Sequence, residues 1–122
     1  MRRIVLLALL AALVSMASVH AAPAHTGKAT KMEALVYKAF GTGWEGRCMV
    51  RVMYRESNGN PKAINWKDRH ANGPGSFGLF QIGRIHVGMV GGDWRRLLDP
   101  ATNVRVAKRL FDGSGIRPWR SC

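Results

Sequence analysis

The stretch from residue 55 to residue 82 constrains the fold of this chain more than any other. It starts at the end of an apolar helical pattern, passes through Asn-Gly-Asn-Pro at residues 58–61, and ends within a compact apolar segment that runs from residue 78 to residue 85. Glycine and asparagine accept left-handed backbone conformations and proline cannot continue a helix, so the helix must stop here. One carboxylate, Glu56, stands at the junction between the helix and the polar turn region that follows.

The first residues have the pattern of an export signal. Met1-Arg2-Arg3 is basic, residues 4–14 are apolar, and small residues lie around Ala21. The apolar run is too short to span a bilayer comfortably, so we expect a cleaved signal peptide at residues 1–21 rather than an uncleaved anchor. No later stretch is apolar for long enough to span. We therefore expect an exported chain, periplasmic or secreted, without a transmembrane segment in its mature part.

The net charge restricts the class of partner. The chain carries 19 Lys and Arg against 7 Asp and Glu, which gives a formal charge of +12. Losing Arg2 and Arg3 with the signal peptide would lower this charge to +10, because all the acidic residues lie downstream. Such a strongly positive charge predicts a polyanionic partner. Export argues against nucleic acid as this partner and favours an anionic cell envelope. The alternative is a basic surface that is solvated and binds no partner, and the charge alone does not exclude it.

Two cysteines, Cys48 and Cys122, are the only ones in the chain. In an oxidising compartment two thiols predict one disulfide, which would stabilise a domain this small by about 4 kcal/mol. The chain has no Cys-x-x-Cys and no His-Glu-x-x-His, and its histidines are scattered. We therefore expect no metal and no cofactor.

Hydrophobic periodicity predicts a small helical domain at residues 31–122. Residues 22–30 are small and polar and predict a flexible leader. Apolar positions recur at helical spacing over residues 31–40, and the Gly-Thr-Gly at residues 41–43 ends that helix. A second helix begins near Trp44 or Glu45, where an acidic residue suits the positive end of the helix dipole.

Glu56 belongs to the apolar face of this second helix. Positions spaced by three, four, seven and eight residues form the face: Cys48, Met49, Val52, Met53 and Glu56. The opposite, solvated stripe consists of Arg47, Arg51 and Arg55. An apolar setting disfavours a charged carboxylate, which is what a general acid needs. The alternative is a surface glutamate in the last helical turn, and periodicity alone does not decide between the two.

The remaining chain adds a polar lobe and further helices. Residues 62–76 predict a loop or a short hairpin. Gln81, inside the apolar segment that follows, is either a satisfied core amide or a group that binds substrate. Asp93 can cap a short helix, and Asp99-Pro100 is a strong start for a helix that stops before Gly113. The tail would pack back through Trp119 and the disulfide.

Several short blocks of the chain form an ordered pattern. The blocks are Glu56-Ser57, Asn60-Pro61-Lys62-Ala63, Gly75-Ser76-Phe77-Gly78-Leu79-Phe80-Gln81-Ile82, and Asp99-Pro100-Ala101-Thr102-Asn103 followed by Ala107. In this order they resemble the lysozyme-like superfamily, most closely the catalytic domain of soluble lytic transglycosylases. The resemblance covers residues 48–119. It implies a lysozyme-like α+β fold, mainly α, with a short polar loop or hairpin lobe beside the Glu56 helix.

The resemblance also implies an activity. Enzymes of this family cleave the β-1,4 bond between N-acetylmuramic acid and N-acetylglucosamine in peptidoglycan, and Glu56 matches their catalytic acid. Asn65 falls where the family has a polar residue near that glutamate, and a plain turn asparagine is the alternative. Gln81 matches a motif glutamine whose role in the family is largely architectural. The partners implied are peptidoglycan strands and, for some relatives, an envelope-spanning secretion or conjugation apparatus; we expect a monomer.

A second carboxylate is the open question. Asp68 is the only acidic residue in the polar lobe, so it is the local candidate for a base that positions water. A solvated loop aspartate is the alternative that we favour. Without a second acid, the resemblance implies that the substrate attacks itself and forms a 1,6-anhydro sugar. Lysozyme-type hydrolysis of the same bond and a non-catalytic cationic wall-binding module remain as alternatives.

Overall fold

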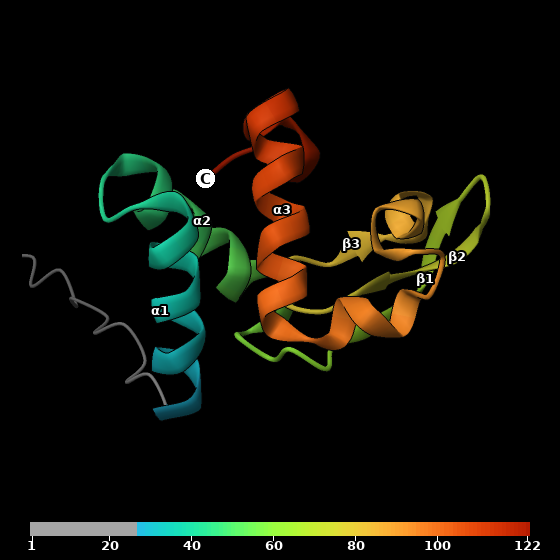
Figure 1. The fold of residues 1–122 in the computed structure, drawn as a ribbon, viewed down its shortest axis with the longest axis horizontal. Coiled ribbons are helices and arrows are strands. Elements are labelled where there is room, and N and C mark those ends of the chain that lie inside the picture. Colours follow the sequence, from blue (N-terminus) through green and yellow to red (C-terminus); the bar gives the residue numbers. More distant parts are fainter. Residues whose placement is uncertain (1–26) are drawn as a thin grey trace, which may run out of the picture.

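The structure, a computed structural model, describes residues 27–122, with side chains from residue 31 onward. The predicted signal peptide at residues 1–21 therefore lies outside the described residues. The elements in order are α1 (Gly27–Phe40), α2 (Trp44–Ser57), β1 (Ile64–His70), β2 (Gly73–Phe77), β3 (Ile82–Gly83), η1 (Arg84–Val90), η2 (Trp94–Leu98), α3 (Pro100–Ser114) and η3 (Arg117–Trp119). In Figure 1 the three α-helices gather on one side and the small sheet lies on the other. This is the mainly helical α+β architecture that the sequence predicts.

The first and last residues of the helices can be traced to local sequence signals. Helix α2 ends where expected, at an Asn58 cap with a left-handed φ of 54° whose N–H donates to the Tyr54 carbonyl. Helix α1 begins at Gly27, four residues before the predicted start of this helix at residue 31. The helix extends because lysine and alanine favour it and no proline or cap stops it. No helix within residues 27–122 is both long and apolar enough to cross a membrane.

The predicted polar lobe is a hairpin. Strands β1 and β2 pair antiparallel, with Asn65 opposite Ser76 and His70 opposite Gly73, and β3 joins the other edge of β2. The register shifts between Asn65 and Arg69, which marks a bulge or irregularity in β1. Such irregularities change the direction in which side chains point, and here the affected segment includes Asp68.

The buried amide of Asn103 joins the two halves of the domain. This side chain is 0% exposed. Its oxygen accepts from the Phe80 N–H at 2.9 Å, and its nitrogen donates to the carbonyls of Phe77 and Leu97, both at 2.8 Å. Gly78 makes room for it, because a Cβ at Gly78 would lie 2.3 Å from the Asn103 nitrogen. Helix α3 is thereby fastened to the turn after β2 and to the end of η2.

The C-terminal tail packs back onto the helices. Trp119 is buried, and its indole N–H donates to the Phe80 carbonyl at 3.0 Å. A disulfide joins Cys48 in α2 to Cys122. Helix α3 runs to Ser114, slightly beyond the predicted stop before Gly113. One glycine inside a helix costs only about 1 kcal/mol, and the actual stop is Gly115, with a φ of 61°.

Replacing Asn103 by leucine tests its central position. Asn103→Leu removes all three hydrogen bonds and leaves buried backbone groups without these partners. Each such group costs about 1–3 kcal/mol, so the free energy of unfolding should fall by about 3–5 kcal/mol. Urea unfolding with the disulfide intact measures this. The control is Asn72→Ala, which removes one exposed hydrogen bond to the Arg84 carbonyl and should cost less than about 1 kcal/mol. Similar losses of unfolding free energy for the two variants would contradict the central structural role of Asn103.

Candidate functional site

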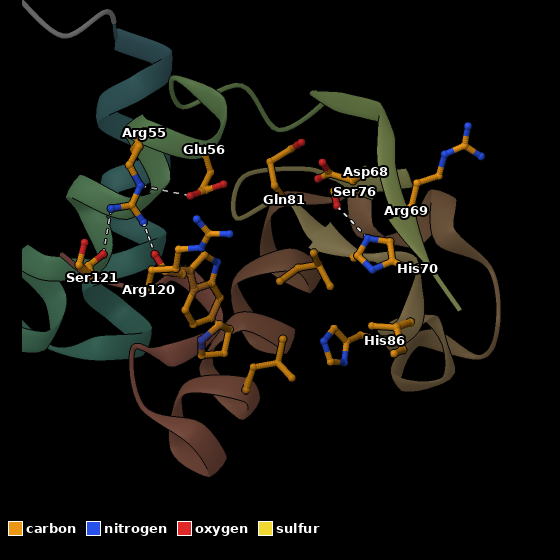
Figure 2. Close-up of a pocket in the computed structure, with 16 residues that line it drawn as sticks. Arg55, Glu56, Asp68, Arg69, His70, Ser76, Gln81, His86, Arg120 and Ser121 are labelled. Atoms are coloured by element: carbon orange, nitrogen blue, oxygen red, sulfur yellow. Dashed lines mark hydrogen bonds and ion pairs between the residues drawn. The ribbon is translucent and has the colours of Figure 1, made fainter. Parts of the chain in front are cut away.

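A cleft with a volume of about 890 Å³ lies between the end of α2, the hairpin, η1 and the C-terminal tail. Cavities of this size are typical of ligand sites. Figure 2 shows the side chains that converge on it from these elements. Its polar lining consists of Arg55, Glu56, Asp68, Arg69, His70, Ser76, Gln81, His86, Arg120 and Ser121.

Glu56 is placed at the cleft by the last turn of α2. Its side chain is 28% exposed, and Oε1 accepts from Arg55 Nε at 3.2 Å. The apolar positions on its face of the helix are buried, among them Met53 one turn earlier. Glu56 itself is not enclosed in the way the periodicity suggested, because the chain turns away at Asn58 and leaves the carboxylate facing the open cleft.

Arg55 lies on the exposed stripe of α2, as predicted, with 42% of its side chain exposed, but it also makes contacts that the sequence did not predict. Its guanidinium donates to Glu56 through Nε, to the Ser121 carbonyl at 2.9 Å and to the Trp119 carbonyl at 2.7 Å. The reason lies far away in the sequence. The disulfide and the buried indole bring the tail beside the end of α2, where its carbonyls meet the arginine.

Gln81 has a left-handed φ of 49°, and its side-chain nitrogen donates to the carbonyls of Ala63 and Gly78 at 3.2 and 3.0 Å. These bonds tie the segment before β1 to the turn after β2. The geometry fits the architectural role that the sequence favoured. Gln81 also lines the cleft, between the Glu56 wall and the hairpin wall (Figure 2).

The structure brings Asn65 and Asp68 together. The Asn65 amide donates to Asp68 Oδ1 at 3.0 Å, and its own oxygen accepts from the Lys67 N–H at 3.0 Å. Asp68 lines the cleft on the hairpin wall, across from Glu56. Asn65 is not among the lining residues, and its hydrogen bond to Asp68 is its contact with the cleft lining. Asn65 thus forms a local turn and also holds the second carboxylate.

Sequence reasoning missed two histidines that the fold brings to the cleft. His70 on β1 lies 3.2 Å from the Ser76 hydroxyl, and its ring packs on Gly83, where a Cβ would approach within 2.4 Å. His86 comes from η1. Alternation along β1 could have placed His70 on the same face as Asp68. No local signal could have placed His86, because its position depends on how η1 packs.

The charge of the cleft is predominantly positive. Its arginines, Arg55, Arg69 and Arg120, outnumber the acidic residues Glu56 and Asp68. Within the part of the chain that the structure describes, no three His, Cys, Asp or Glu side chains are placed to hold a metal ion together. The arrangement provides one carboxyl group on the helical wall, a second on the hairpin wall, and cationic surroundings suited to an anionic polymer.

Comparison with known proteins identifies a family. A family model described as a lysozyme-like domain matches residues 33–121. The matched segment includes every residue that lines the cleft. No curated protein matches the chain, and no solved structure matches it.

Protonation of His86 should weaken the fold. Burial, and secondly the charge of His70, lower the pKa of His86 from its ordinary value. The unfolded chain, whose histidine titrates near pH 6.5, therefore binds more protons as the pH falls through this range. The free energy of unfolding should decrease from about pH 7 to about pH 5.5, and His86→Gln should reduce that decrease. Urea unfolding at each pH measures both slopes. Parallel pH dependence in the two proteins would contradict the prediction.

Proposed function

The chain belongs to the lysozyme-like domain family, and on that premise we propose that it cleaves the β-1,4 bond between N-acetylmuramic acid and N-acetylglucosamine in peptidoglycan. The observation that carries the proposal is the position of Glu56. It lies at the end of α2 and faces a cleft of about 890 Å³. Glu56 is also the residue that matches the catalytic acid in the motif pattern.

Glu56 acts first as the general acid. Its protonated carboxyl donates to the glycosidic oxygen while the bond from that oxygen to C1 of the muramic acid breaks, and N-acetylglucosamine leaves with the proton. The resulting carboxylate then acts as the base. The partly exposed setting supports this second role, because a residue open to the cleft can take up a proton from a group bound there.

We propose that the muramic acid supplies its own nucleophile. Its 6-hydroxyl attacks C1, Glu56 takes the hydroxyl proton, and a 1,6-anhydro sugar forms. Hydrolysis is the second candidate, and one observation favours it: Asp68 lines the opposite wall and is held by Asn65. A carboxylate placed in this way could orient a water molecule for attack on C1.

The proposed place of action is the cell envelope. Disulfides persist in oxidising compartments, and the structure joins Cys48 to Cys122. The formal charge of +12 suits an anionic wall. We therefore propose that residues 1–21 are a signal peptide and that the folded part works in the periplasm or outside the cell.

Glu56→Gln tests the catalytic role. The amide keeps the shape of the side chain but cannot donate or accept the proton in the same way. Clearing of peptidoglycan in a zymogram should fall by at least about 100-fold. Glu45→Gln is the matched control, because Glu45 is an exposed glutamate at the other end of the same helix. Equal clearing by Glu56→Gln and the unmodified protein would rule out Glu56 as the catalytic acid. No clearing by either protein would leave only a wall-binding module.

The mass of the products separates the two reaction routes. Purified sacculi digested with the unmodified protein should give muropeptides one water lighter than hydrolysis products. Asp68→Asn preserves the acceptor for the Asn65 amide and should leave those products unchanged. Hydrated products that disappear with Asp68→Asn would instead establish hydrolysis with Asp68 as the base that positions water.

A further inference from the structure

We infer that Arg55 is a positioning residue for Glu56, and that the C-terminal tail at residues 119–122 holds Arg55 in place for this task. The inference rests on the proposed function. The disulfide holds the tail, the tail carbonyls bind the Arg55 guanidinium, and the guanidinium binds the Glu56 carboxyl group.

The first step of the argument is the geometry of Arg55. Each of its three nitrogens has a different acceptor: Nε binds Glu56, Nη1 binds the Ser121 carbonyl and Nη2 binds the Trp119 carbonyl. Figure 2 shows all three contacts as dashed lines. A planar guanidinium fixed at two points cannot rotate freely, so its third donor has a fixed direction. Arg55 is therefore more ordered than an arginine with 42% of its side chain exposed would otherwise be.

The second step is what holds the tail. Trp119 is buried and bonded to the Phe80 carbonyl, and Cys122 is bonded to Cys48. Between them Arg120 adopts φ 72° and ψ −48°, and the Ser121 N–H donates to the Trp119 carbonyl at 2.9 Å. This is a γ-turn of the rare, strained kind. Strained backbone persists only where the surroundings fix it, and such places concentrate at functional sites.

The third step is the need of Glu56 for a partner. Among residues 27–122, the hydrogen bond from Arg55 is the only one that the Glu56 side chain makes. A glutamate in the last turn of a helix has several rotamers available, and an ordered donor restricts them. A catalytic group displaced by about 1 Å can lose about 100-fold in rate. The fixed guanidinium is what keeps the carboxyl group directed into the cleft.

Kinetics of the Arg55 variants test this role. We expect Arg55→Gln to lower kcat about 10-fold or more and to change KM less than about 2-fold. Arg55→Lys should not restore kcat, because one ammonium cannot contact Glu56 and two carbonyls at once. The matched control, Arg51→Gln, changes an exposed arginine of the same helix and should leave kcat unchanged. A lysine variant with full kcat, or an effect on KM alone, would overturn the inference and make Arg55 a plain cation or a substrate contact.

A double-mutant cycle tests the link to the disulfide. Cys48→Ser with Cys122→Ser frees the tail and should lower kcat, and adding Arg55→Gln should lower it little further. Losses that multiply independently would overturn the inference. Circular dichroism measures whether the double serine variant folds. If that variant does not fold, the kinetics of Arg55→Gln and Arg55→Lys are the test of the inference. If Glu56→Gln abolishes clearing while Arg55→Gln keeps full kcat, only this inference fails. If the unmodified protein shows no clearing at all, the proposed function fails.

Discussion

Three hydrogen bonds to one buried amide connect the parts of this domain. Asn103 sits in α3, yet its partners are the backbone of Phe77, Phe80 and Leu97. Because the turn after β2 is fastened in this way, Gln81 is held where it can bond the segment before β1. The hairpin wall of the cleft thus takes its position from the helical half, in which Glu56 lies. Gly78 is part of the same contact, since only a residue without a side chain leaves room for the amide.

The sequence predicted those elements whose signals are local. Helices α2 and α3 have clear apolar periodicity and strong boundary residues, Asn58 and Asp99, and both lie close to where they were expected. The start of α1 and the end of α3 differed because a few residues of helix cost or gain little free energy. The polar lobe could not be resolved into loop or hairpin, because its Asn72-Gly73 pair is offset by one residue from the observed Ala71-Asn72 turn, and Gly73 already pairs with His70.

The candidate site was predictable only where it coincides with a short motif. Glu56 and Gln81 belong to the motif pattern, and both line the cleft. Asp68 also lines it, although the sequence favoured a solvated loop aspartate. The contribution of His86 and the contacts of Arg55 were missed, because each depends on residues more than a helix length away in sequence. Periodicity describes one element at a time, and a cleft formed by two α-helices, three strands, η1 and a disulfide-bonded tail has no signature in any one of them.

The disulfide also has a topological consequence. Every residue that lines the cleft, from Arg55 to Ser121, lies between Cys48 and Cys122 in the sequence, whereas α1 lies outside that interval. The bond therefore closes a covalent ring that contains all walls of the cleft. A protease that cuts the ring once leaves both fragments connected through the two sulfur atoms. Two cuts are needed before any wall of the cleft can diffuse away, so the disulfide protects the cleft against a single cleavage of the chain.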